Sequence, residues 1–363
     1  MISSTIFDVA EKAGVSIKSV SRVLNGEPNV SAAMREKVLV ACEALQYTPN
    51  ISARVMAGSK SYFIISLNDH DLTRSNWESE RGNNWIDRML FGAMTACETA
   101  GYHFMMELVG RDSPDLERQV LAILGSMRPD GLILTQPNAE NDRLIDMLYG
   151  RRLPFVRIGS SDDRHGFKVR MDDVSAAYDA TDYLIQLGHT RIGLISGSPK
   201  FLVSAQREQG YRAALTAAGI AIEPALIQQG DFSFASGERA SEALFNLHTP
   251  PTAIIASNDE MALAALKTAA RRGLRVPDQV SIISFDDGAG VKFSSPPLTS
   301  IRQPTAEIAM KAVELLVAAV ENQPIAALDH IVPHRLILRE SCAPPQGLGD
   351  AQTRYRIGQR VNR

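Results

Sequence analysis

The sequence predicts a small all-α helix-turn-helix head followed by an α/β core of two doubly wound lobes with parallel sheets. In the first 50 residues, apolar side chains recur at helical spacing in short runs, and a glycine separates the first two runs. From residue 61 onward, short apolar segments alternate with amphipathic stretches. Such alternation is typical of a mostly parallel sheet covered by helices.

The first two helices are predicted from their caps and their apolar faces. Thr5 can cap a helix whose apolar residues follow at helical spacing, and Gly14 then permits a tight turn. Ser16 can cap a second helix, whose buried face would consist of Val20, Val23 and Leu24. Two short helices joined by such a turn form a helix-turn-helix. A small helical hairpin with a solvated face is the alternative.

The exposed face of the second helix would carry short donors and cations, namely Ser16, Lys18, Ser19, Ser21 and Arg22. Arginine can bond guanine edges through two hydrogen bonds, and serine and lysine can bond bases or phosphates. This chemistry suits a helix in the major groove of DNA. Residues 1–60 have a net charge of +2 and the rest of the chain −5, which permits DNA binding at this end without proving it.

A third helix, expected over residues 32–45 behind the potential cap Ser31, completes the head. The loop before this helix contains Asn25 and Asn29. Together with Ser31, these side chains could reach phosphates, which is a sequence-neutral role.

The core is predicted to contain ten strands, at residues 62–67, 103–108, 131–135, 155–158, 169–171, 192–196, 226–229, 253–256, 280–285 and 300–303. Amphipathic runs separate most of them, at residues 86–100, 176–187, 207–218, 237–246, 260–272 and 305–320. This number of strands suggests two sheets. No Gly-x-Gly-x-x-Gly follows any predicted strand, and no glycine-rich loop ends in Gly-Lys-Ser or Gly-Lys-Thr, so the sequence argues against a dinucleotide or nucleoside triphosphate site.

Polar or aromatic residues follow the predicted strands at their carboxyl ends, where ligands bind in doubly wound sheets. These residues are Asp69-His70, Gln136, Ser160-Ser161, Asp231-Phe232, Asn258-Asp259 and Asp286-Asp287. Arg207 lies near the start of a helix that follows another of these strands. A cleft of carboxylates, amides and an arginine around aromatic rings suits a polyhydroxylated ligand, because each hydroxyl group both donates and accepts hydrogen bonds.

The head has the pattern Asp8-Val9-Ala10-x-x-Ala13-Gly14-Val15-Ser16-x-x-x-Val20-Ser21-Arg22-Val23-Leu24-Asn25-Gly26, which resembles the DNA-binding signature of the LacI/GalR family of bacterial transcriptional regulators. The core resembles the family's effector-binding part, which is similar to a periplasmic sugar-binding protein. The matching stretches of the core are Leu187-Gly188-His189-x-Arg191-Ile192, Arg207-x-x-Gly210-Tyr211, Gly230-Asp231-Phe232-Ser233, Asn258-Asp259-x-Met261-Ala262, Ser284-Phe285-Asp286-Asp287 and Pro297-Leu298-Thr299-x-Ile301-Arg302-Gln303.

The resemblance implies that the head binds DNA and that residues 49–60 form a hinge helix. In the family, this segment becomes ordered on the operator, pairs with its dimer mate and inserts a side chain, usually leucine, into the minor groove. Met56 occupies that position here. A flexible linker is the alternative. The candidate DNA-binding residues are Thr5, Ser16, Ile17, Lys18, Ser21, Arg22, Asn25, Asn29, Ser31, Tyr47, Asn50, Ala53 and Met56.

The resemblance also implies that a small sugar-like effector binds between the two lobes of the core. The candidate effector-binding residues are Asp69, Trp85, Gln136, Arg207, Phe232, Asn258, Asp286 and Gln303. The last five match effector contacts of the family, and Trp85 matches an aromatic position. As alternatives, Phe232 would be a core residue and Gln303 a structural residue at a crossover between lobes.

The sequence departs from the family pattern at residues 68–84, where a longer polar loop is expected. Arg74, Trp77 and Arg81 within it have no counterpart in the family. This segment would be a lid, a selectivity element or a solvated loop.

The predicted domains are a head at residues 1–48, a hinge at 49–60, a core at 61–343 and a disordered tail at 344–363. Lobe one of the core is expected at about 61–159 and 303–322, and lobe two at about 160–302 and 323–343. The tail contains no leucine heptad, so a homodimer is expected rather than a tetramer.

The sequence thus predicts a sequence-specific DNA-binding regulator of the bacterial cytoplasm, associated with the nucleoid. Its expected role is to repress carbohydrate-utilisation genes by binding a pseudo-palindromic operator, with an affinity that the effector changes allosterically. The alternatives are a cytoplasmic sugar-binding protein and a sugar-active enzyme, each without operator function. Catalysis is not expected, because the neighbouring Asp286 and Asp287 would point in opposite directions on a strand.

Other classes of site are not indicated by the composition. Cys42, Cys97 and Cys342 are far apart and fit no zinc or redox spacing, so reduced thiols are expected. The seven histidines form no metal-binding motif, and neither a metal nor a cofactor is expected. The chain has no apolar run of 18 residues and shows no signal peptide, so no membrane partner is expected.

Overall fold

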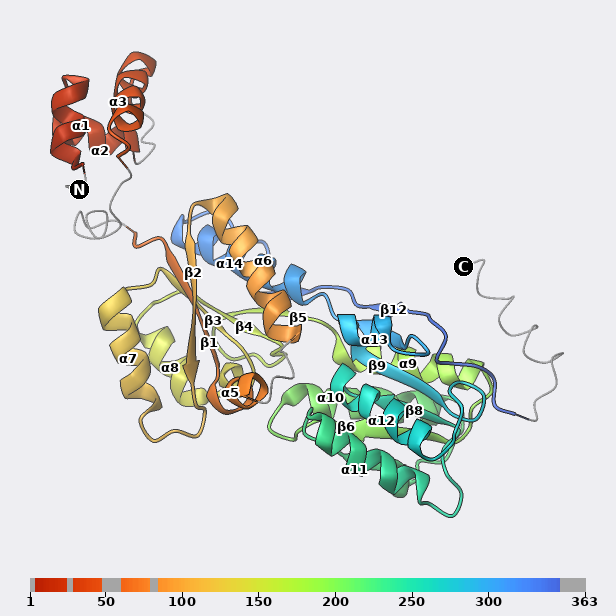
Figure 1. The fold of residues 1–363 in the computed structure, drawn as a ribbon. Helices are drawn as coiled ribbons and strands as arrows, with labels where there is room; N and C mark the ends of the chain where they lie inside the picture. Colours follow the sequence, from red (N-terminus) through yellow and green to blue (C-terminus); the bar gives the residue numbers. More distant parts are fainter. Residues whose placement is uncertain (1–3, 25–28, 48–59, 79–83, 347–363) are drawn as a thin grey trace. The chain divides into compact units, whose positions relative to one another are not determined.

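The structure is a computed structural model that describes residues 4–24, 29–47, 60–78 and 84–346 (Figure 1). It divides into two compact units, Met1–Tyr62 and Phe63–Arg363, which are called here the head and the core. Some predictions concern residues outside the described ranges. These are the DNA contacts Asn25, Asn50, Ala53 and Met56, the hinge before residue 60 and the tail after residue 346.

In the described residues of the head, the chain forms three helices: α1 (Ile6–Ala13), α2 (Ile17–Leu24) and α3 (Ala32–Ala44). Thr5 caps α1 in a capping box with Asp8, and Gly14 ends the helix with a φ of 65°, in the left-handed region that favours glycine. The interior of the head consists of Val9, Ala10, Val20, Val23, Val38, Ala41 and Cys42. Since all three helices contribute to this interior, α2 packs against both of its neighbours.

The first sheet of the core has the strand order β11-β5-β4-β3-β1-β2, and its neighbouring strands are all parallel. Its strands are β1 (Phe63–Asp69), β2 (His103–Val109), β3 (Gly131–Leu134), β4 (Phe155–Ile158), β5 (Phe167–Arg170) and β11 (Asp329–Ile331). The helices of this lobe are α5 (His70–Glu78), α6 (Asn84–Ala100), α7 (Leu116–Met127), α8 (Asp142–Gly150), α14 (Thr305–Val320) and the short η1 (Asn138–Glu140). α6 packs against α14, and a side chain at Gly92 would collide there with the carbonyl group of Ala306.

The second sheet has the strand order β12-β10-β9-β8-β6-β7, in which only the β10–β12 pair is antiparallel. Its strands are β6 (Ile192–Ser196), β7 (Ile227–Gln229), β8 (Ala253–Ala256), β9 (Ser281–Asp286), β10 (Thr299–Arg302) and β12 (Arg335–Ile337). The helices of this lobe are α9 (Asp173–Gln186), α10 (Leu202–Ala217), α11 (Phe234–Phe245), α12 (Asp259–Arg271), α13 (Ala289–Phe293) and the short η2 (Pro224–Leu226). α9 packs against α10, where a side chain at Gly210 would collide with the carbonyl group of Val174.

The chain passes from one sheet to the other three times. β5 leads to α9, β10 leads to α14, and β11 leads to β12. The structure therefore corrects the predicted lobe ranges, which place residues 160–302 and 323–343 in lobe two, because β5 and β11 belong to the first sheet. Arg170 joins these two neighbouring strands through hydrogen bonds of 3.2 and 3.1 Å to Asp329.

Two further differences concern short or polar segments. The expected polar loop at residues 68–84 contains the helix α5, which Asp69 stabilises by accepting a hydrogen bond from the Leu72 N–H group at 2.8 Å. Arg74 and Glu78 add an ion pair of 2.6 Å one turn apart. The strands β11 and β12 are not predicted either. Each has only three residues.

Candidate functional site

The start of α2 is an exposed part of the predicted DNA-binding surface. The side chains of Ser16, Ile17 and Lys18 are exposed, and Ile17 is 40 % exposed although it is apolar. Ser21 and Arg22 are half-buried. Arg22 donates a hydrogen bond of 3.1 Å to the carbonyl oxygen of Asn29, which ties α2 to the loop before α3.

Three other predicted DNA contacts have structural roles within the head. Thr5 caps α1, and Ser31 caps α3 by accepting a hydrogen bond from the Met34 N–H group at 3.3 Å. Tyr47 packs against the interior of the head. Thr5 and Ser31 are exposed, so their caps leave these hydroxyl groups at the surface beside helix N-termini, where backbone N–H groups can bind phosphates.

One cavity of the core, with a volume of about 460 Å³, is lined by residues of both lobes. This size lies within the range of small-molecule sites, about 300–1,000 Å³. All eight predicted effector-binding residues line it: Asp69, Trp85, Gln136, Arg207, Phe232, Asn258, Asp286 and Gln303. The structure therefore collects them in one place at the carboxyl ends of strands of both sheets, as the rule for doubly wound sheets requires.

Arg207 of α10 is buried at the wall of this cavity. Its Nε donates to Asp173 at 2.8 Å, and its Nη1 donates to the carbonyl oxygen of Ser257. The guanidinium carbon lies 4.4 Å from the ring centroid of Phe285, which adds a cation–π contact. Burial raises the pKa of Asp173, while the charge of Arg207 opposes this shift. The two charges stabilise each other in an interior that would otherwise exclude both.

Asn258 and Phe232 are linked where β8 and β7 end. The Asn258 Oδ1 accepts a hydrogen bond from the Met261 N–H group at 3.0 Å and so caps α12, while its Nδ2 donates to the Phe232 carbonyl oxygen at 2.8 Å. A side chain at Gly197 would collide with the Phe232 ring, so this glycine makes room for it. Phe232 also packs against the core of lobe two, so it lines the cavity and belongs to the hydrophobic interior at once.

Asp286, the last residue of β9, accepts a hydrogen bond from the side chain of Gln303 at the crossover to α14. Burial, and next the charge of Asp259, raise the pKa of Asp286 to about 8. Burial likewise raises the pKa of Asp259 to about 6. At neutral pH the carboxyl group of Asp286 is therefore largely protonated and can donate as well as accept a hydrogen bond. Asp287 faces other partners and bonds Arg302 at 2.7 Å.

Gln136 connects three segments at the edge of the cavity. Its Nε2 donates to the Gly159 carbonyl oxygen at 2.8 Å, and its Oε1 accepts a long hydrogen bond of 3.5 Å from the Val203 N–H group of α10. Gly159 has a φ of 82°, and a side chain there would collide with Gln136. The glutamine thus spans from the first lobe to the second.

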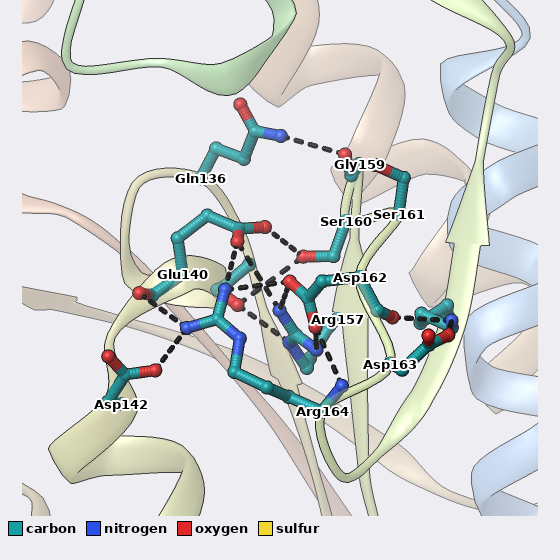
Figure 2. A network of polar contacts seen from close by, with 12 residues as sticks. Gln136, Glu140, Asp142, Arg157, Gly159, Ser160, Ser161, Asp162, Asp163 and Arg164 are labelled. Carbon is teal, nitrogen blue, oxygen red and sulfur yellow. Dashed lines mark hydrogen bonds and ion pairs between the residues drawn. The ribbon is translucent and has the colours of Figure 1, made fainter.

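A network of charged side chains holds the loop that follows Gly159 (Figure 2). Arg157 is fully buried and donates to both oxygens of Asp162 at 2.7 and 2.6 Å. Arg164 also bonds Asp162, at 2.7 Å, and both arginines contact Glu140. The hydrogen bonds from Arg157 are the largest cause that holds the pKa of Asp162 well below its usual range. The loop is thereby fixed where Ser161 accepts a hydrogen bond of 3.3 Å from Gln206 of lobe two.

Three features of this region are not predicted from the sequence. Asp173, the partner of Arg207, follows a strand as the predicted residues do, so the same rule about strand ends could have found it. Phe201 lines the cavity beside Phe232, with ring centroids 5.6 Å apart, and lies in an irregular segment without a pattern. The network around Arg157 gives no signal, since charged residues in a sequence are expected at the surface. Trp77, in contrast, is 48 % exposed and does not line the cavity.

Two other kinds of feature are absent from the described residues. In that part of the chain, no helix is both long and apolar enough to cross a membrane. Nor do any three His, Cys, Asp or Glu side chains there come together in a way that could hold a metal ion.

Comparison with known protein families gives matches for both units. Residues 5–50 match the model of bacterial regulatory proteins of the lacI family, and residues 181–342 match a periplasmic binding protein-like domain. The first match covers the three helices of the head. The second covers most of lobe two, including five of the eight predicted effector-binding residues.

The chain is also similar to individual proteins over nearly its whole length. It is 33 % identical over 343 residues to the HTH-type transcriptional repressor CytR of Escherichia coli (strain K12), which covers 93 % of this chain and 96 % of that protein. It resembles the lac repressor dimer bound to operator and the anti-inducer ONPF, with 27 % identity, a TM-score of 0.79 and coverage of 94 % and 100 %. It resembles the transcriptional regulator CelR–cellobiose complex with 29 % identity, a TM-score of 0.70 and coverage of 93 % and 99 %. The chain therefore belongs to the lacI family of bacterial regulatory proteins.

Proposed function

We propose that this chain is a sequence-specific transcriptional repressor of carbohydrate-utilisation genes in the bacterial cytoplasm. As a homodimer, it would bind a pseudo-palindromic operator through its heads, and a small sugar-like effector in the core cavity would change its affinity for the operator. The observation that carries this proposal is the combination, in one chain, of the exposed start of α2 with a cavity that collects all eight predicted effector-binding residues. Two similar structures, the lac repressor dimer bound to operator and the CelR–cellobiose complex, support it.

The cavity is suited to couple ligand binding to the arrangement of the lobes. Lobe one contributes Asp69, Trp85 and Gln136, and lobe two contributes Arg207 and Asp286. A ligand that bonds both sets favours one arrangement of the lobes over another, and the operator affinity changes if the two arrangements bind DNA differently. Catalysis is not part of this proposal. Asp286 and Asp287 have different partners, so they are not a pair that could share an acid–base task.

Selection of bound sequences from random duplex DNA tests the proposal, with the purified full-length protein. We expect a palindrome of about 14–20 base pairs, since two heads of a dimer read half-sites one helical turn or more apart. The recovered duplex then serves as a probe for release, or for tighter binding, in the presence of sugars. Failure to recover a motif both with and without pooled sugars would favour the alternative, a sugar-binding protein without operator function.

Arg22→Ala tests the assignment of α2 as the recognition helix. If Arg22 reads a base, the variant loses about 1–3 kcal/mol of specific binding free energy, measured by titration of the selected duplex. Binding to random duplex DNA should change less, since phosphate contacts do not depend on sequence. Arg118→Ala is the matched control, because Arg118 is an exposed arginine of α7 in the core. Equal affinity of wild type and Arg22→Ala for the selected duplex would contradict this role.

A further inference from the structure

The charged side chains that line the core cavity are predominantly acidic. Six of them are carboxylic acids: Asp69, Asp87, Asp173, Asp259, Glu260 and Asp286. The only cationic residues among the described lining residues are Arg170 and Arg207. Whether the cavity can bind an anionic ligand therefore depends on whether these two guanidinium groups are already paired with carboxylates of the protein.

Both guanidinium groups already face carboxylates of the protein. Arg207 bonds Asp173 at 2.8 Å, and the side chains of this pair are 4 % and 5 % exposed. Arg170 bonds both oxygens of Asp329, at 3.2 and 3.1 Å. A ligand anion would have to share a cation whose charge is already neutralised.

Three carboxyl groups of the cavity, in contrast, are held by neutral donors. Asp259 accepts hydrogen bonds from the Ser284 hydroxyl and the Gly288 N–H group, both at 2.6 Å. Asp69 accepts a hydrogen bond from the Leu72 N–H group, and Asp286 accepts one from Gln303. Within the described residues, none of the three forms an ion pair, so Asp69 and Asp259 add negative charge to the cavity without a paired cation, while Asp286 is largely protonated at neutral pH.

A smaller cavity of about 290 Å³ shares Asp69, Leu72, Phe201 and Ser233 with the first. It contains the cations Arg111 and Lys200, but four aspartates line it as well. Lys200 lies 3.9 Å from one of them, Asp112. An anion that extended from the main cavity into this one would therefore meet a second excess of negative charge.

We infer that the core cavity selects an uncharged, hydroxyl-rich ligand and rejects phosphorylated sugars and sugar acids. An anion in the cavity would lose its hydration without gaining a free cation, and it would lie near carboxylates of the same sign. A neutral sugar could instead use the carboxyl oxygens as acceptors, while its C–H faces pack against Trp85, Phe201 and Phe232. This inference rests on the proposed function and narrows the class of effector.

Matched sets of neutral and charged sugars test this inference on the full-length protein. The probes are glucose and galactose, each with its 6-phosphate, its uronic acid and its 2-amino-2-deoxy derivative, and cellobiose with cellobionate. Binding is measured by thermal shift and then by calorimetry at pH 7. We expect at least one neutral sugar to bind, and its anionic counterparts to bind more than about a hundredfold more weakly, as like charges brought close together require.

Three results would overturn the inference. They are an anionic probe that binds as tightly as its neutral parent, an amino sugar that binds more tightly, and no binding by any probe. None of these would refute the proposed DNA function, because recovery of an operator motif is measured independently of the sugars. If no operator motif were recovered but neutral sugars bound selectively, the proposed regulatory function would be refuted. The inference on the cavity would remain intact.

Asp69→Asn tests whether charge is the cause of the selectivity. The variant keeps an oxygen that can accept the Leu72 N–H hydrogen bond but removes one negative charge from the cavity wall. The affinity ratio between the neutral sugar and its uronic acid should fall, by about threefold to tenfold for a partly exposed charge. Asp146→Asn, an exposed position of α8 outside the cavity, is the matched control and should leave the ratio unchanged. An unchanged ratio in Asp69→Asn would show that shape rather than charge excludes the acid.

Discussion

Arg207 and Arg157 are both buried in the core, one at the wall of the cavity and the other behind it. Arg207 is held by a single carboxylate, Asp173, together with a carbonyl group and an aromatic ring. Arg157 does not line the cavity, and its two carboxylate partners also bond a second arginine, Arg164. Arg207, at the cavity wall, thus has one carboxylate partner that is almost completely buried. Arg157, which does not line the cavity, belongs to a network whose carboxylates are shared with Arg164.

The difference shows how burial of charge can serve two purposes. The pair of Arg207 and Asp173 joins α10 to the start of α9 and forms part of the cavity wall. The network around Arg157 instead fixes the loop from Gly159 to Arg164, which contacts Gln206 of the second lobe through Ser161. The first arrangement should be the more sensitive to loss of its cation, because among the described residues Arg207 is the only cation that bonds the carboxylate of Asp173.

The largest effect is expected for Arg207→Ala. The variant leaves Asp173 buried without its cation, which should lower the free energy of unfolding by about 3–5 kcal/mol, measured by urea denaturation. The double variant Arg207→Met with Asp173→Leu is the control, because it removes both buried charges and should recover most of the loss. If the double variant were as unstable as the single one, the loss would come from packing and not from the uncompensated charge.

Arg157→Ala should lower the free energy of unfolding by a smaller amount, about 3 kcal/mol. Its partner Asp162 is 31 % exposed and keeps the hydrogen bond from Arg164, so its charge stays partly compensated. Urea denaturation of both variants, Arg157→Ala and Arg207→Ala, shows which of them loses more free energy of unfolding. A larger loss for Arg157→Ala would reverse the comparison and show that the network contributes more than the pair at the cavity.

The third expected effect is a dependence of the free energy of unfolding on pH, which comes from the carboxyl groups of Asp286 and Asp162. The pKa of Asp286 is raised by burial to about 8, so its protonated form stabilises the fold, and this stability is lost as the pH rises through that value. The pKa of Asp162 is lowered, chiefly by the hydrogen bonds from Arg157, so its contribution is present at neutral pH and lost in acid.

Urea denaturation at a series of pH values separates the two groups. Asp286→Asn should flatten the decline of stability between pH 5 and pH 8, and Asp162→Asn should flatten the decline below about pH 4. The exposed variant Asp146→Asn serves as the control for both. Slopes that equal those of the wild type in both variants would show that these groups do not govern the pH dependence.

The main elements of the fold could be predicted because local signals specify them. Each of the ten predicted strands overlaps a strand of the structure, since buried parallel strands read as short apolar runs between helical segments. Helix α5 could not be predicted in this way, because its stability depends on the cap at Asp69 and the ion pair of Arg74 with Glu78 rather than on an apolar face. The placement of β5 and β11 in the first sheet depends on pairing between distant segments, which no local pattern in the sequence predicts.

The lining of the cavity followed from the rule that ligands bind at strand ends, together with the family resemblance, and all eight predicted residues line it. The hydrogen-bond partners of these residues could not be predicted from the sequence. Arg207 is separated from Asp173 by 34 residues, and Asp286 from Gln303 by 17. Such pairs form only when helices and strands pack, so the sequence could indicate which side chains face the cavity but not how their charges are neutralised.

The three passages of the chain between the sheets also constrain how such proteins can be recombined. Lobe one consists of two separate pieces of the chain, since β11 and α14 follow all but one strand of lobe two. A chimera that exchanged one lobe for that of a relative would need junctions at all three passages, and a gene fragment cut at the middle passage, between β10 and α14, would leave both sheets incomplete. New ligand specificities in this architecture should therefore arise by replacement of residues within the cavity more readily than by exchange of whole lobes.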